Sequence, residues 1–138
     1  MSHEPFEYGL VPMGESGLTV EKPEADVRGR KVLDEAGEEI GHVDDLLIDE
    51  RDRRVRLLRV AAGGFLGLGE RHFLVPVDAI AAVGEDEVRL GHRRDRVVAS
   101  PAYDPKLCKQ PDYLTDLYSY WGYGPYWGAG YVYPPFPY

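Results

Sequence analysis

Apolar and polar residues alternate in short runs through the middle of the chain, over residues 27–92. Each run ends at a glycine, a proline or a group of charged residues. Short, closely spaced runs of this kind are typical of antiparallel strands in a small barrel or sandwich. The expected strands are 31–34, 39–49, 55–60, 71–75, 79–83 (alternatively a turn of helix) and 87–90.

Details of the pattern predict how these strands bend and turn. Alternation slips at Gly41 and again at Asp44-Asp45, which predicts a long strand bent by bulges. Gly37 can take the positive φ of a tight hairpin. A barrel is favoured because a flat sheet of this size leaves two exposed edges. The predicted core is Ile40, Val43, Leu46, Ile48, Val55, Leu58, Val60, Phe73 and Val75.

The segments on either side of this zone differ from it in chemistry. Residues 1–26 are acidic and are interrupted by three prolines, so we expect an irregular N-terminal segment. Residues 93–138 form a linker and an aromatic C-terminal tail rich in glycine and proline. Helical turns are expected at 77–79 and at 112–117, where Asp112 is placed to cap.

A fold signature spans the middle zone. Gly29-x-x-Val32-x-Asp34 opens it, and Phe73-Leu74-Val75-Pro76 followed by Val77-Asp78 closes it. The residues between them that carry the resemblance are Gly37, Ile40, Gly41, Val43, Asp45, Leu46, Ile48, Asp49, Val55, Leu58, Val60, Gly63, Gly64 and the 67–69 loop. On these residues, 27–92 resembles the PRC-barrel domain, shared by the cytoplasmic part of the photosynthetic reaction-centre H subunit and by the ribosome maturation factor RimM.

The resemblance implies an all-β fold, a small PRC-type β-barrel. The shared residues are mostly apolar or glycine, which is the pattern of a scaffold. No catalytic residues belong to the fold itself, and neither relative's function transfers with it.

Composition and charge narrow the class of protein. The chain has 138 residues, 43% of them hydrophobic, which suits one folded domain with a tail. Its net charge of −8 disfavours nucleic acid, because phosphate contacts need clustered positive charge. The lone Cys108 excludes an internal disulfide and fits a reducing compartment. We expect a cytoplasmic location, since the sequence shows no secretion signal or membrane-spanning run.

Metal, cofactor and catalytic sites are not expected. His3, His42, His72 and His92 are far apart in sequence, and Cys108 has no near partner, whereas zinc sites usually contain a closely spaced ligand pair. An acidic cluster surrounds the end of the 39–49 strand and comprises Asp44, Asp45, Asp49, Glu50 and Asp52. Because Arg51, Arg53 and Arg54 interleave with it, we expect a solvated, self-neutralising hairpin end. Asp34 and Asp45 are alternatively expected to cap turns through side-chain hydrogen bonds.

Two further segments have candidate roles. The glycine-rich 63–69 segment lacks the Lys-Ser/Thr ending of a phosphate-binding loop and precedes a predicted strand. Its Phe65 and Leu66 are predicted contact residues, since loops on a rigid scaffold often carry binding. Arg93, Arg94 and Arg96 form a small basic patch, which we expect to pair with the acidic N-terminal segment.

The aromatic tail, residues 113–138, is the most unusual feature. It holds eight tyrosines, both tryptophans and Phe136, with Asp116 as its only charge. Tyrosine and tryptophan suit interfaces because each ring is large and apolar with a polar tip. Three alternatives follow: the tail packs on its own barrel or a sister subunit, docks another protein or a membrane interface, or forms a disordered sticker segment. The predicted contact residues are Trp121, Tyr123, Tyr126 and Trp127.

The sequence therefore favours a non-catalytic structural or protein-interaction module without cofactors, self-associating as a homodimer. A ribosome-maturation or RNA-processing accessory resembling RimM is one alternative. A membrane-peripheral adaptor resembling the H-subunit domain is the other.

Overall fold

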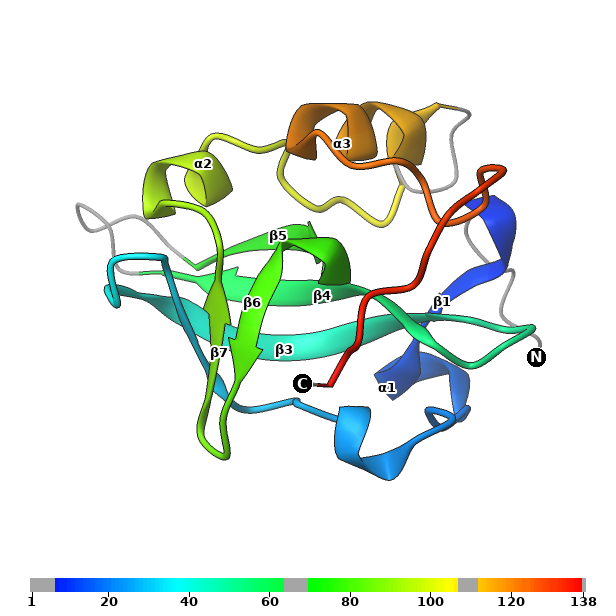
Figure 1. Cartoon of the computed structure of the whole chain (residues 1–138), viewed down its shortest axis with the longest axis horizontal. Helices are drawn as coiled ribbons and strands as arrows, with labels where there is room; N and C mark the ends of the chain where they lie inside the picture. The colour runs from blue at the N-terminus through cyan, green and yellow to red at the C-terminus, as the bar shows by residue number, and fades with distance from the viewer. Residues whose placement is uncertain (1–6, 64–69, 107–111, 138) are drawn as a thin grey trace.

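A single curled sheet dominates the computed structural model, which describes residues 7–63, 70–106 and 112–137 (Figure 1). The strands are β1 (Leu10–Pro12), β2 (Lys31–Leu33), β3 (Glu39–Asp49), β4 (Val55–Ala62), β5 (Arg71–Pro76), β6 (Ile80–Val83) and β7 (Glu87–Leu90). They run in the order β5-β4-β3-β2-β7-β6, and β1 pairs with β3 off this path. The predicted all-β class is confirmed, with the sheet forming a half-barrel.

The long strand β3 organises this sheet. Its first half pairs with β2, its C-terminal end pairs with β1, and β4 runs along most of its length. The β3–β4 register shifts between Val43 and Asp45 and between Leu47 and Ile48, so the prediction of a bulged, bent strand is confirmed. β1 was not predicted: it places a part of the acidic N-terminal segment inside the sheet.

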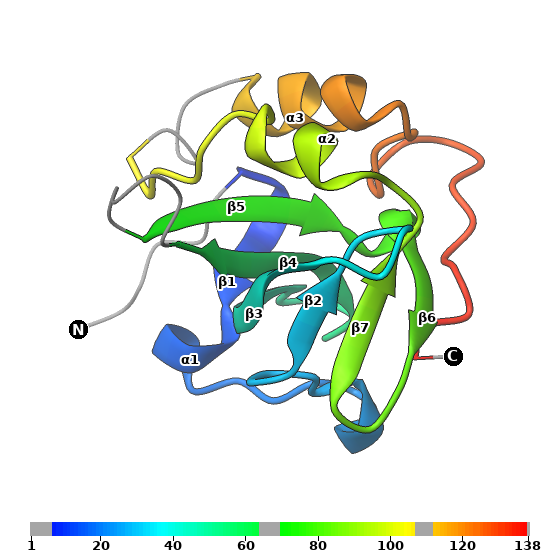
Figure 2. The same ribbon diagram turned by 90° about the vertical axis from the view of Figure 1, so that its left-hand side faces the viewer.

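Short helices cover the ends of the half-barrel. They are η1 (Glu7–Gly9), α1 (Met13–Ser16), η2 (Pro23–Ala25), η4 (Val77–Ala79), α2 (Arg94–Val98) and α3 (Tyr113–Trp121). Both views show α2 and α3 lying together on the β5 side of the sheet (Figures 1 and 2). Asp112 does precede α3, but the predicted capping is wrong, because its φ is 73° and its side chain makes no cap hydrogen bond.

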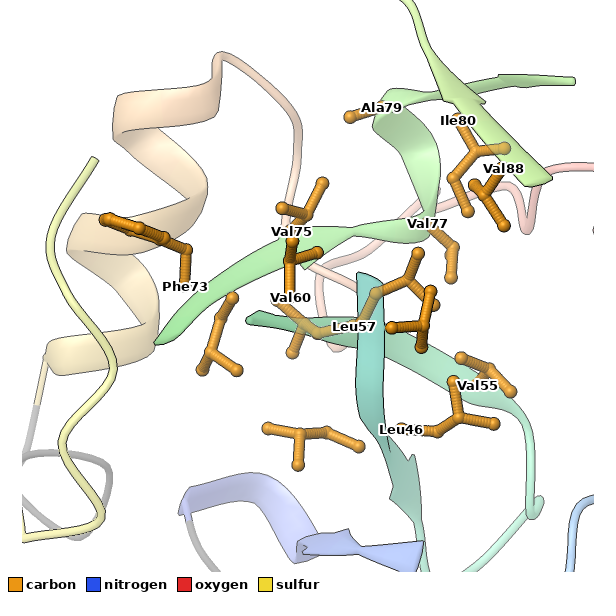
Figure 3. Close-up of a cluster of buried hydrophobic side chains, with 14 of the residues drawn as sticks. Leu46, Val55, Leu57, Val60, Phe73, Val75, Val77, Ala79, Ile80 and Val88 are labelled. Atoms are coloured by element: carbon orange, nitrogen blue, oxygen red, sulfur yellow. The ribbon is translucent and has the colours of Figure 1, made fainter. Parts of the chain in front are cut away.

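The core is larger than the sequence pattern indicated. All of the predicted core residues are buried, and Figure 3 shows several of them converging from adjacent strands. The structure adds residues from the N-terminal segment, from α2 and from the aromatic tail. These include Leu10, Val27, Val97, Leu114, Leu117, Tyr118 and Trp121. The flanking segments therefore pack with the half-barrel as part of one core.

Both outer strands are protected from edge-to-edge pairing. At β5, Phe73 forms a bridge with Ala102, and the Tyr103 N–H donates to the His72 carbonyl. At the other end, β6 has only four residues and its register with β7 shifts between Ile80 and Ala82. A covered edge and a short, bulged edge are both poor templates for adding a strand.

Candidate interaction site

The aromatic tail packs on the half-barrel of its own chain, in two parts. The first part is α3, whose Leu114, Leu117, Tyr118 and Trp121 are buried. The second part, residues 125–137, is here called the strap. It descends from the α3 end of the molecule and crosses to the opposite end of the half-barrel (Figure 1). Of the three alternatives for the tail, the structure shows packing on its own barrel; exchange with a sister subunit stays a prediction.

Three tyrosine hydroxyls attach the strap to three different segments. The Tyr126 hydroxyl donates to the Tyr8 carbonyl at 2.9 Å, and the Tyr133 hydroxyl donates to the Val55 carbonyl at 3.0 Å. Between them, the Tyr131 hydroxyl donates to Asp78 Oδ2 at 3.0 Å. Each bond uses an acceptor at a fixed place in the scaffold, so the spacing of the tyrosines along the strap sets its position.

Arg56 lies at the centre of this contact. Its side chain is buried on β4, with Nε 2.7 Å from Asp49 Oδ2. The guanidinium carbon is 4.8 Å from the ring centre of Tyr126, 5.9 Å from that of Tyr131 and 5.2 Å from that of Tyr133. Cation–π attraction is strongest where water is excluded, as it is here. Burial lowers the pKa of Arg56, but the hydrogen bond and charge of Asp49, together with Tyr131 and Tyr133, more than offset it, so the pKa is raised.

The acidic cluster around the end of β3 is neutralised, but not in the way predicted. Asp45 and Asp49 are buried rather than solvated. Their partners are Arg56 and Arg59 on β4, instead of the arginines of the 51–54 turn: Arg59 Nε lies 2.8 Å from Asp44 and its Nη2 lies 3.9 Å from Asp45. Buried carboxylates require such partners, because an unpaired buried charge is very costly.

Of the two aspartates proposed as turn caps, Asp34 acts in that way, whereas Asp45 lies within β3 and binds a distant segment instead of capping a turn. Asp34 Oδ1 accepts the N–H groups of Ala36 and Glu38, both at 2.9 Å, which closes the β2–β3 hairpin. Its Oδ2 accepts the Arg94 N–H at 3.1 Å and ties the hairpin to α2. Asp45 accepts the Gly14 N–H of α1 at 3.0 Å. Both aspartates thus fix the scaffold that supports the tail.

A buried polar cluster lies where the strap meets η4. Burial raises the pKa of Asp78, and the hydrogen bond from Tyr131 opposes that effect. Burial also raises the pKa of Tyr118 well above its ordinary value and that of Tyr133 to about 12. Asp78 Oδ1 and the Tyr118 hydroxyl have no hydrogen-bond partner among the described residues. Burial thus shifts each of these groups toward its neutral form, in which a tyrosine hydroxyl keeps the proton that it donates.

A second set of contacts holds the α3 end of the tail. His92 Nε2 lies 2.6 Å from the Tyr123 hydroxyl, and the His92 ring packs edge-on against Trp121. Arg96 Nη2 donates to the Tyr120 carbonyl at 2.6 Å, and the guanidinium carbon of Arg96 lies 4.8 Å from the centre of the Tyr120 ring. The expectation that this basic patch pairs with the acidic N-terminal segment is therefore wrong for Arg96, whose partners belong to α3.

The predicted contact residues occupy three kinds of position. Trp121 is buried inside the chain, so it anchors α3. Tyr123, Tyr126 and Trp127 are half-buried, and Trp127 stacks on Tyr8 with ring centres 3.8 Å apart. Phe65 and Leu66 lie outside the described residues.

Sequence reasoning did not identify Arg56 and Asp78, the half-barrel residues that contact the strap. One signal was present: Arg56 is a charged residue inside the apolar run 55–60. A charge at such a position is expected to have a dedicated partner when the strand is buried on both faces.

Metal-ligand clusters and membrane-spanning helices are both absent from the part of the chain that the structure describes. Across residues 7–63, 70–106 and 112–137, histidine, cysteine, aspartate and glutamate side chains do not gather in threes as ligands for a metal ion. His42 is exposed on β3, and His72 pairs with Asp44 at 3.2 Å. None of the helices in the described part of the chain has the length and apolar character needed to cross a bilayer.

Comparison with known proteins gives one family. The model of the PRC-barrel domain matches residues 21–96, which is more than half of the chain. The match covers β2 to β7 and reaches α2, but leaves α3 and the strap outside. A search of curated proteins finds no relative that matches the chain.

Proposed function

The chain belongs to the PRC-barrel domain family, and on that basis we propose that it is a non-catalytic protein-interaction module. Its contact surface is the outer side of α3 and the strap, residues 113–137, which lie outside the family match. The half-barrel then serves as the rigid support for that surface.

The observation that carries this proposal is a neutral aromatic surface on an acidic molecule. The chain has a net charge of −8, yet residues 117–137 contain no charged side chain. Tyr120, Tyr123, Tyr126 and Trp127 are only half-buried, and Val132 is 82% exposed. Interface centres are enriched in tyrosine and tryptophan and depleted of charge. This surface therefore has the composition of an interface before any partner is bound.

We further propose that one partner is a second copy of the chain. Two copies with a net charge of −8 repel each other over most of their surfaces. They can approach closely where charge is absent, which is along residues 117–137. Association through the sheet is disfavoured, because the β5 edge is covered and the β6 edge is short and bulged.

Affinity capture from the native cell tests the proposal. The bait is the full chain, compared with Val132→Glu, which places a charge in the neutral surface, and with Ala82→Glu, which adds the same charge at an exposed position of β6. We expect a partner that the wild-type chain and Ala82→Glu retain and that Val132→Glu loses. Equal capture by all three baits contradicts the proposed surface. Variant-sensitive capture of ribosomal proteins favours the RimM-like alternative, and capture of membrane complexes favours the adaptor.

A further inference from the structure

The strap is attached to the half-barrel in the manner of a bound peptide. Its hydroxyl bonds reach Tyr8, Val55 and Asp78, which lie far from it in sequence. Among the described residues, the backbone hydrogen bonds of the strap join its own residues to one another, as from the Gly128 N–H to the Pro125 carbonyl. Side chains therefore determine where the strap binds, and its backbone does not extend the sheet.

The floor beneath the middle of the strap is polar, whereas Phe136 near its C-terminal end is buried in the apolar core. Arg56, Asp49 and Asp78 form the polar floor, and Arg56 and Asp49 are already paired with each other. If the strap left, water would solvate this ion pair. If α3 detached, by contrast, its own Leu114 and Leu117 and the apolar side chains packed against them would be exposed to water. The strap buries one side chain in the core and α3 buries four, so the strap opens at a lower cost than α3.

The strap also leaves space at both of its ends. A hollow of about 380 Å³ lies beside Tyr126 and Trp127, between them and the 49–52 turn. Another of about 310 Å³ lies beside Tyr133 and Phe136, against the 20–25 segment. The strap is thus seated on the groove without filling it.

The groove is specific for tyrosine. Two of its acceptors, the carbonyls of Tyr8 and Val55, cannot move away from the scaffold, and each accepts one phenol hydroxyl. Arg56 attracts the faces of the same rings. Phenylalanine would keep the ring and lose the hydrogen bond. A fitting ligand is therefore an uncharged peptide with tyrosines at the spacing of Tyr126, Tyr131 and Tyr133.

We infer that this groove is a peptide-binding site whose partner is the strap of a second copy, so that two chains exchange residues 125–137. The inference rests on the proposed function and specifies its mode of self-association. Reciprocal exchange gives each copy the same contacts, as a two-fold symmetric dimer requires. The tethered strap competes at high effective concentration, so exchange increases as the protein concentration rises.

A labelled peptide of residues 125–137 tests the groove by fluorescence anisotropy. The receiving chain is full-length Tyr126→Phe/Tyr131→Phe/Tyr133→Phe, whose own strap is weakened while Arg56, Asp78 and the rings stay in place. We expect binding at least tenfold tighter to this variant than to the wild-type chain. A control chain, Tyr120→Phe, removes a hydroxyl bond to Arg96 away from the strap and should bind like wild type. A peptide with phenylalanine at all three positions should bind at least tenfold more weakly.

Sedimentation of the unmodified chain provides the second measurement and does not depend on any variant folding. We expect concentration-dependent dimers that excess unlabelled peptide converts to monomers. If the chain forms dimers but does not bind the peptide, strap exchange is overturned, whereas the proposal of an interaction module stands. Peptide binding by a chain that stays monomeric overturns both the second copy as partner and the proposed self-association. Equal binding of the tyrosine and phenylalanine peptides overturns the specificity of the groove.

Discussion

At the scale of single residues, the closest approach inside the sheet occurs at Gly41 on β3. A Cβ atom built there would lie 2.0 Å from the Ala61 carbonyl oxygen on β4. The backbone of β4 cannot yield as a flexible side chain would, so only glycine allows this pairing. The slip in alternation that predicted a bend at Gly41 therefore has a steric origin.

Gly41→Ala is the corresponding prediction. We expect it to lower the free energy of unfolding by about 1–3 kcal/mol, the range typical of overpacking. Gly124→Ala is the matched control, because a Cβ at Gly124 meets nothing within 4 Å. Urea unfolding of both variants measures the difference, and equal midpoints would show that β3 and β4 can separate without cost.

The buried hydroxyl of Tyr133 leads to a prediction of how the stability of the protein changes at alkaline pH. An unfolded tyrosine ionises with a pKa of about 10, whereas burial raises the pKa of folded Tyr133 to about 12. The folded state holds the phenol proton more tightly than the unfolded state does. The resulting contribution of Tyr133 to the free energy of unfolding is complete below pH 10 and is lost as pH rises towards 12. We expect Tyr133→Phe to lose less stability than wild type over that interval, measured as thermal midpoints. Parallel losses would contradict the burial of this hydroxyl.

At the scale of elements, β2 to β7 follow from local chemistry, whereas β1 and the path of the strap do not. Alternation between charged turns predicted the positions of β2 to β7, and Asp34 predicted the hairpin turn that its carboxylate closes. β1 was missed because three residues ending in Pro12 are too few for a periodic signal. The strap was missed because its contacts join residues far apart in sequence, such as Tyr133 and Val55.

The apolar face of α3 makes this helix part of the core, although it lies outside the family match. We expect Leu117→Ala to lower the free energy of unfolding by about 2–5 kcal/mol, because Leu117 is fully buried. Thr115→Ala, at an exposed position of the same helix, should change it little. Chemical denaturation compares the two variants. If Leu117→Ala unfolds like Thr115→Ala, α3 is not packed on the half-barrel in solution.

At the scale of the whole molecule, the chain consists of a half-barrel closed on one side by α3 and crossed by the strap (Figures 1 and 2). The half-barrel and α3 share one apolar core, in which α3 buries four side chains. The strap adds one buried side chain, Phe136, to that core and otherwise lies with half-buried rings over the groups around Arg56. Burial of large aromatic rings contributes stability in proportion to the apolar area removed from water. The two parts of the tail therefore differ in what their removal exposes.

Two truncations separate these contributions. Ending the chain after Gly124 removes only the strap, and we expect a folded, soluble protein that has lost its concentration-dependent dimers. Ending it after Gln110 also removes α3, which uncovers the apolar surface that Leu114, Leu117 and Trp121 cover, so we expect aggregation or a molten state. Circular dichroism and sedimentation measured together distinguish the outcomes. A well-folded monomer after the longer truncation would show that the PRC-barrel domain is stable without α3, and retained dimers after the shorter truncation would place self-association on a surface other than the strap.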